Sequence, residues 1–314
     1  MSKNTTMSIT RRTALLSVAA ALVTMALKFG AFLLTGSVGL LSDAAESSVN
    51  LVAALIAFTA LTIADRPPDD DHTYGHDKAE YFSSGAEGTL ILIAATVILY
   101  TAINRILHPV PLENLGIGVV IALIASAINF GVSRIMLRVA RKEDSIALEA
   151  DANHLMTDVW TSVGVVVGVG LVALTGWQIL DPLIAIAVAI QIIVMGIRLI
   201  KRSMLGLMDT TLPQGEVTVI TQAIAHACGE ETPYHALRTR KSGSRRFVDF
   251  HLLLPGKTSV QESHDLVMKI EGEIEQQLAH TYVTIHVEPK EDHASWDGQM
   301  VGGLSSPAAA SGQP

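Results

Sequence analysis

The chain has 314 residues, of which 49% are hydrophobic and 17% are charged, whereas soluble chains carry about 25% charged residues. This composition, together with a formal net charge of −8, excludes a disordered chain and a basic nucleic-acid-binding protein. Cys228 is the single cysteine of the sequence, which excludes a disulfide framework and a CxxC metal site.

Long apolar runs fill the chain from Thr13 to about Leu205. No small-residue cleavage motif follows the first run, so we expect no cleaved signal peptide. A span needs roughly 20 mostly apolar residues. The runs that meet this length predict six transmembrane helices, over residues 13–35, 40–64, 82–107, 115–137, 147–174 and 178–200. These helices form a predicted membrane domain of residues 13–208, which follows an N-terminal segment of residues 1–12.

The positive charges between these runs predict the orientation in the membrane. If both termini are cytoplasmic, twelve Lys and Arg residues lie on the cytoplasmic side and Arg105 alone lies on the other side, as the positive-inside rule requires. We therefore expect cytoplasmic termini, and the short loops favour a bacterial inner membrane. The twelve residues are Lys3, Arg11, Arg12, Arg66, Lys78, Arg134, Arg138, Arg141, Lys142, Arg198, Lys201 and Arg202.

Residues 209–292 are charged and periodic, as in a small soluble domain. Their α-β-β-α-β order predicts a small α+β open-faced sandwich on the cytoplasmic side. Residues 293–314 are of low complexity and are predicted to form a disordered tail. The predicted elements are a helix between Pro213 and Gly229, strands over 234–240 and 245–254, a helix over 259–278 and a strand over 281–287.

Polar side chains inside the second and fifth predicted spans indicate a function, because such groups are expensive in a membrane. Glu46 and Asn50 are four residues apart and share one helical face, and so do His154 and Asp158. Two facing pairs of this kind can supply four ligands to a divalent cation, whose charge the two carboxylates offset. The alternative is that these groups only pair with one another or cap helix kinks.

Two further aspartates lie near these pairs. Asp43 is about one turn from Glu46 and nearer the outer end, so a packing or outer-gate role is expected as much as metal ligation. Asp151 continues the face of His154 and Asp158 toward the cytoplasm, which predicts an entrance residue.

The loop after the second span contains Asp69, His72 and His76 at metal-ligand spacing, with Gly75 allowing a turn between the two histidines. A solvated acidic loop is the alternative for these three residues. In the soluble domain the candidate metal ligands are four histidines and a carboxylate, and the alternative is that they are packing or surface residues. They are His235, His251, His264, His286 and Glu288.

Taken together, these features resemble the cation diffusion facilitator family from about Arg11 to Pro289. The family is one of homodimers with six spans and a metallochaperone-like cytoplasmic domain, which exchange metal for protons. The resemblance therefore implies the same fold and activity here. The motifs that carry it are TGSV at 35–38, SDAAE at 42–46, HTYGHDKAE at 72–80, EADANH at 149–154 followed by Asp158, LMD at 207–209 and HALRTR at 235–240.

Carried over by position, the resemblance assigns three metal sites and one structural pair. Glu46 and Asn50 depart from the usual Asp or His and Asp of the family, and Glu288 stands where Asp is usual. The implied sets are the transport site Glu46, Asn50, His154 and Asp158; the loop site Asp69, His72 and His76; the binuclear cytoplasmic site His235, His251, His264, His286 and Glu288; and the dimer interlock Lys78 and Asp209.

We therefore expect a homodimeric antiporter that moves a divalent metal out of the cytoplasm and protons inward. Zn²⁺ is the first expectation, while Fe²⁺, Mn²⁺ and Co²⁺ stay open because a single imidazole among oxygen ligands weakens the preference for zinc. His154 is the expected proton carrier, since imidazole titrates near physiological pH. A membrane-tethered metal sensor or buffer that binds without transporting is the alternative. The sequence has no HExxH, GxSxG or P-loop, so we do not expect an enzyme.

Overall fold

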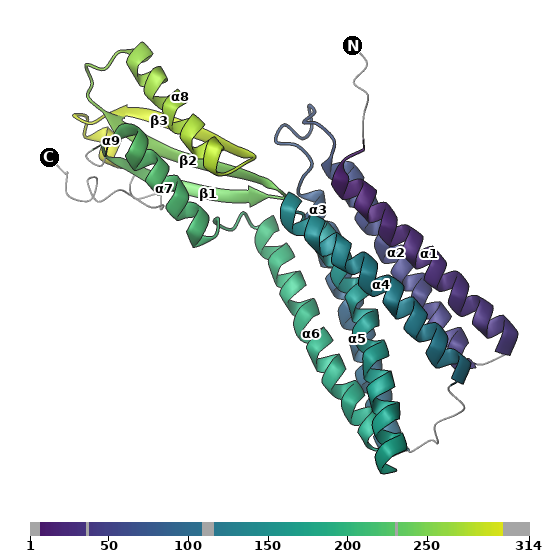
Figure 1. Cartoon of the computed structure of the whole chain (residues 1–314). Coiled ribbons are helices and arrows are strands. Elements are labelled where there is room, and N and C mark those ends of the chain that lie inside the picture. The colour runs from purple at the N-terminus through teal and green to yellow at the C-terminus, as the bar shows by residue number, and fades with distance from the viewer. Residues whose placement is uncertain (1–6, 36–37, 109–115, 230–231, 298–314) are drawn as a thin grey trace. The chain divides into compact units, whose positions relative to one another are not determined.

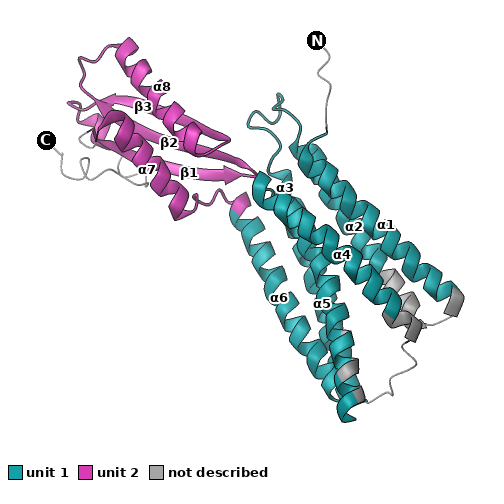
Figure 2. Ribbon diagram, in the orientation of Figure 1, with its two compact units in different colours: residues 1–205 teal, residues 206–314 magenta. Residues whose placement is uncertain are grey.

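The computed structural model describes residues 7–35, 38–108, 116–229 and 232–297, without the side chains of residues 34–46, of residues 116–119 and of a few positions in the fifth helix and at residue 297 (Figure 1). The chain forms two compact units, residues 1–205 and 206–314, which are coloured separately in Figure 2. The six expected spans fall in the first unit and the expected α+β domain falls in the second.

The described residues of the first unit form six long helices, as predicted. Each has 27 to 30 residues, which at about 1.5 Å per residue is enough to cross the roughly 30 Å hydrocarbon core. Five of them are also apolar enough to span a membrane, and α5 is the sixth long helix. The helices are α1 (Ile9–Thr35), α2 (Val38–Ala64), α3 (Ala79–Leu107), α4 (Gly116–Glu143), α5 (Ile146–Thr175) and α6 (Leu180–Leu207).

Helix α5 takes part in two buried apolar clusters among the described residues of this unit. Its Ala147 and Leu148 join α1, α2 and α4 around the fully buried Met136, while its Ala150 packs with Ile91 of α3 and residues of α6. Small residues such as alanine let the helix backbones approach closely. The polar side chains of α5 are therefore held inside the bundle by neighbours on several sides.

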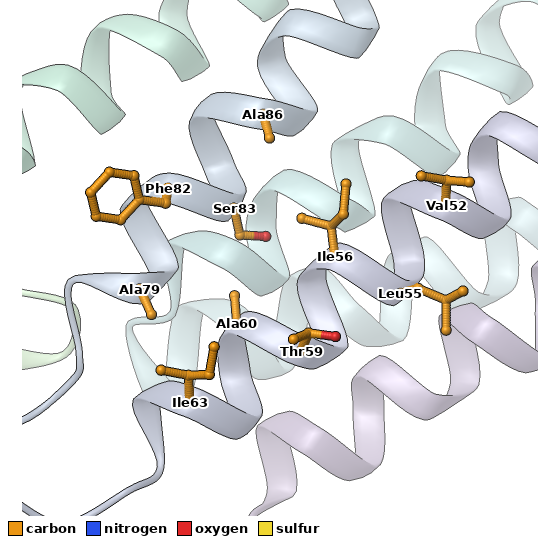
Figure 3. Close-up of a pocket in the computed structure, with 10 residues that line it drawn as sticks. All are labelled: Val52, Leu55, Ile56, Thr59, Ala60, Ile63, Ala79, Phe82, Ser83 and Ala86. Atoms are coloured by element: carbon orange, nitrogen blue, oxygen red, sulfur yellow. The ribbon is translucent and has the colours of Figure 1, made fainter.

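A separate groove of about 590 Å³ lies between α2 and α3. Figure 3 shows the residues that line it, among them Val52, Ile56 and Phe82, which are apolar. None of the ten labelled residues is a predicted metal ligand. This groove is consequently not the predicted metal site.

The start of α5 is held by a carboxylate from α3. Glu80 is 6% exposed, and its carboxylate accepts hydrogen bonds from the Ser145 hydroxyl at 2.6 Å and from the Ala147 backbone N–H at 3.2 Å. Ser145 is the N-cap of α5 and accepts from the Leu148 N–H. Since the first N–H groups of a helix have no partner within it, Glu80 completes the cap and links α3 to α5.

Replacing Glu80 by alanine is expected to lower the free energy of unfolding by about 1–3 kcal/mol, because two buried donors lose their acceptor. Glu80→Gln keeps an acceptor oxygen and is expected to lose less. Chemical denaturation of the purified chain in detergent measures both changes. Equal stability of Glu80→Ala and the unmodified protein would contradict the role of this carboxylate.

The second unit has the predicted α-β-β-α-β order, followed by one short helix. Its strands form one sheet in the order β1-β2-β3, with β1 antiparallel and β3 parallel to β2. In the second strand Val248, Phe250 and Leu252 are buried against α7 and α8. The elements are α7 (Gln214–Cys228), β1 (Tyr234–Ser242), β2 (Arg245–Leu254), α8 (Val260–Gln277), β3 (Thr281–Pro289) and α9 (Ala294–Asp297).

Helix α9 corrects the expectation that disorder begins at residue 293. Trp296 is 9% exposed and packs against the buried Leu253 of β2, and its indole N–H donates to the Lys290 carbonyl at 3.0 Å. These contacts give Ala294–Asp297 a fixed place on the sheet. Residues 298–314 of the expected tail lie outside the described residues.

Candidate metal sites

Three of the four predicted transport ligands meet between α2 and α5. Asn50 and His154 are only 3% and 4% exposed. The Asn50 Oδ1 atom lies 2.8 Å from His154 Nε2, and the Asn50 amide nitrogen donates to the Asp158 carboxylate. The side chain of Glu46, the fourth predicted ligand, lies outside the described part, as does that of Asp43.

A residue that the sequence did not single out completes this cluster. Asn129 of α4 is 2% exposed, and its amide nitrogen donates to Asp158 Oδ2 at 3.1 Å. It lies within the fourth predicted span, where a buried polar residue is itself a signal of function. Two amide groups therefore hold the Asp158 carboxylate.

The hydrogen bonds of the cluster define which atoms can bind a cation. The amide nitrogen of Asn50 donates to Asp158, so its oxygen accepts from the Nε2–H of His154. In that tautomer His154 Nδ1 carries a lone pair, and this buried atom has no hydrogen-bond partner. A neutral imidazole nitrogen, an amide oxygen and a carboxylate are together a donor set that transition-metal cations accept.

The loop residues Asp69, His72 and His76 also converge. Their potential ligand atoms all lie within 4.8 Å of one another, with the two imidazole rings 4.5 Å apart. Asp69 lies 3.2 Å from His76 Nε2 and accepts the His72 backbone N–H at 2.7 Å. That backbone N–H lowers the pKa of the Asp69 carboxyl, which keeps it ionised for a cation. Gly75 has φ +90°, a conformation that glycine adopts without strain, as the expected turn requires.

In the second unit the pairing of the strands brings three histidines into one row. His235 of β1 pairs with His251 of β2, which pairs in turn with His286 of β3. A β-bulge follows His235, and Ala236 has φ +53° there. Neighbouring rings are consequently 5.0 Å and 4.8 Å apart.

The Glu288 carboxylate lies among these rings. One oxygen is 3.0 Å from His235 Nε2, and the other is 3.3 Å from His251 Nδ1 and 3.7 Å from His286 Nδ1. His235 is fully buried, whereas the His286 side chain is 66% exposed. The group of ligand atoms found among the described residues to lie within 4.8 Å of one another consists of His235, His251 and Glu288, without His286. The fifth predicted ligand, His264, is exposed on α8 and is not part of this group either. Its assignment stays a prediction.

The remaining predicted residues lie in several places. Asp151 is 1% exposed and accepts from the Ser17 hydroxyl of α1 at 3.0 Å, so it lies inside the bundle. Lys78 precedes α3 in the first unit. Asp209, in the second unit, has φ +54° and lies 3.5 Å from the Arg240 guanidinium, an ion pair that the sequence did not predict. The interlock between Lys78 and Asp209 stays a prediction.

The first unit is a bundle of long apolar helices that contains a buried His–Asn–Asp cluster, and the second unit is an α+β domain that contains a His–Glu cluster. These features define an integral membrane protein with candidate cation-binding sites. Two family models match the chain: "Cation efflux transmembrane domain" over residues 14–208 and "Cation efflux protein, cytoplasmic domain" over residues 212–290. The chain thus belongs to the cation diffusion facilitator family, a family of cation-efflux transporters.

Individual relatives agree with this assignment. The uncharacterized transporter sll1263 of Synechocystis sp. is 48% identical over 93% of this chain and 94% of its own. The cation-efflux pump FieF of Klebsiella pneumoniae is 30% identical over 88% of this chain and 92% of its own. Among solved structures, the zinc form of CzrB, described as a candidate zinc transporter, is 34% identical over 26% of this chain and 94% of its own, with a TM-score of 0.25.

Proposed function

We propose that the protein exports a divalent transition metal from the cytoplasm in exchange for protons. The observation that carries this proposal is the convergence of Asn50, His154 and Asp158 inside the helical unit. A sensor or buffer needs no ligands buried among membrane helices, whereas a transporter does. The relatives named as cation-efflux pumps support the direction of transport.

The cargo binds through residues that are hydrogen-bonded to one another in the structure. A cation would be held by His154, Asp158 and Asn50, with Glu46 as the predicted fourth ligand. Because an imidazole must be neutral to bind a metal, protonation of His154 from the far side would release the cation. Return of the protonated site to the cytoplasmic side would complete the exchange.

We propose that the other two clusters regulate transport in a homodimer with cytoplasmic termini in a bacterial inner membrane. The loop residues Asp69, His72 and His76 would collect the cation, and the cluster around Glu288 would bind it when it is abundant. Zn²⁺ is the preferred cargo in this proposal, supported by the histidines of the loop cluster and of the cluster around Glu288.

Gradient-driven uptake into proteoliposomes tests the proposal. With an imposed pH gradient, Zn²⁺ is expected to give the largest flux among Zn²⁺, Fe²⁺, Mn²⁺ and Co²⁺. Asn50→Asp adds an anionic oxygen ligand, so we expect a lower KM and a flux ratio shifted toward Mn²⁺. Binding of all four cations without flux would contradict transport and would favour a membrane-tethered sensor.

A further inference from the structure

Two carboxylates that the proposed transport step does not use lie buried inside the helical unit. Glu87 of α3 is 0% exposed and Asp151 of α5 is 1% exposed. They are close enough for the negative charge of Asp151 to act on Glu87. Neither forms an ion pair with a basic side chain among the described residues. Two like charges buried together without a counter-charge are costly, so the pair must take up either a proton or a cation.

Each carboxylate has one oxygen satisfied by a serine and one that is not. The Ser83 hydroxyl donates to Glu87 Oε1 and the Ser17 hydroxyl donates to Asp151 Oδ1, both at 3.0 Å. The second oxygens, Glu87 Oε2 and Asp151 Oδ2, are buried and have no hydrogen-bond partner, and the same holds for the Ser84 hydroxyl. Buried polar atoms in proteins nearly always have a partner, so these oxygens are candidates to bind a ligand.

We propose that Glu87 and Asp151, with the hydroxyls of Ser17 and Ser84, form a second divalent-cation site in the helical unit. Two carboxylates balance the charge of the cation. The Ser17 hydroxyl donates its proton to Asp151, which leaves its lone pairs for the cation. All these ligands are oxygen atoms, a donor set that suits Mn²⁺ or Mg²⁺ better than Zn²⁺. The site thus differs in chemistry from the cluster around His154.

The proposed second site lies close to the proposed transport site along α5. Asp151 precedes His154 by three residues on α5, a rise of about 4.5 Å along the helix. A cation at Glu87 and Asp151 would therefore lie about one helical turn from the transport ligands. A role as an additional binding site for the transported cation rests on the proposed function, whereas cation binding at Glu87 and Asp151 does not.

Mn²⁺ binding to the purified full-length protein in detergent tests the inference. Electron paramagnetic resonance counts the bound Mn²⁺ per chain, and we expect Glu87→Gln and Asp151→Asn each to lose one ion. The lost population is expected to show no coupling to nitrogen, since its ligands are oxygens. The matched control is Glu149→Gln on the same helix, whose carboxylate pairs with Arg202; it should keep the full count.

Two further variants keep the result open to refutation. Glu87→Asp retains the charge and should bind the ion with lower affinity, which guards against a folding defect in Glu87→Gln. His154→Ala should lose gradient-driven flux and still keep the oxygen-bound Mn²⁺, so the two proposals fail separately. An unchanged Mn²⁺ count in Glu87→Gln and Asp151→Asn would overturn the second site and would indicate that the pair shares a proton.

Discussion

His154→Ala is expected to reduce metal flux into proteoliposomes by at least about 100-fold, because loss of an outer-shell partner alone costs about 10–100-fold in metal affinity. His154 is the single imidazole in the cluster with Asn50 and Asp158. Its removal takes away a ligand and also leaves the buried Asn50 oxygen without its partner at 2.8 Å. Radioactive or dye-detected metal uptake under a fixed pH gradient measures the effect.

The control for this variant is another histidine of the same unit. His108 is exposed at the end of α3 and lies outside every cluster described for the transport site. His108→Ala should therefore retain the flux of the unmodified protein. If His154→Ala also retained it, the assignment of the transport site to α2 and α5 would be wrong.

The apolar runs predicted the six helices but not where all of them end. The fourth and sixth runs stop at residues 137 and 200, whereas α4 continues to Glu143 and α6 to Leu207. Both extensions carry positive charges, such as Lys142 and Arg202. Hydropathy marks the part of a helix that lipid can cover, and a helix with charged side chains continues beyond it into water.

The i, i+4 spacing predicted that His154 and Asp158 share one face of their helix, and both contact Asn50 there. It could not predict Asn129, whose place beside Asp158 depends on how α4 packs against α5. Glu87 carried a usable signal, since an ionisable residue inside a predicted span indicates function. Its pairing with Asp151, however, depends on the packing of α3 against α5.

The soluble domain shows the same division between local pattern and tertiary contact. Because successive side chains of a strand point to opposite faces, the burial of Val248, Phe250 and Leu252 under the helices places His251 on the other face of the sheet. The row of His235, His251 and His286 depends on strand register and on the bulge after His235. A single sequence does not specify parallel pairing between strands separated by a helix.

Glu288→Ala is expected to remove most of the metal-dependent stabilisation of the C-terminal unit. With free metal at 100 times Kd, binding to the native state stabilises it by about 2.7 kcal/mol. Glu288 lies within 3.0–3.7 Å of three imidazole nitrogens. If its loss weakens binding about 100-fold, the same metal concentration leaves only about 0.4 kcal/mol.

Hydrogen exchange of the β2 amides in the full-length protein measures this difference, because it reports the opening free energy of one region. Zn²⁺ should slow exchange strongly in the unmodified protein and little in Glu288→Ala. Glu291→Ala is the matched control. The backbone N–H of Gly256 lowers the pKa of Glu291, and this exposed carboxylate lies outside the cluster, so its variant should keep the full response to Zn²⁺.

The pH dependence of this response separates metal binding from simple packing by Glu288. Metal ligands must be deprotonated, so protons compete with Zn²⁺ for this cluster and the protection by Zn²⁺ should weaken as the pH is lowered from about 7.5. Glu288→Asp keeps the charge on a shorter arm and should retain part of the protection. If Glu288→Ala and the unmodified protein gained the same protection from Zn²⁺ at pH 7.5, the row of histidines would not be a metal site that depends on Glu288.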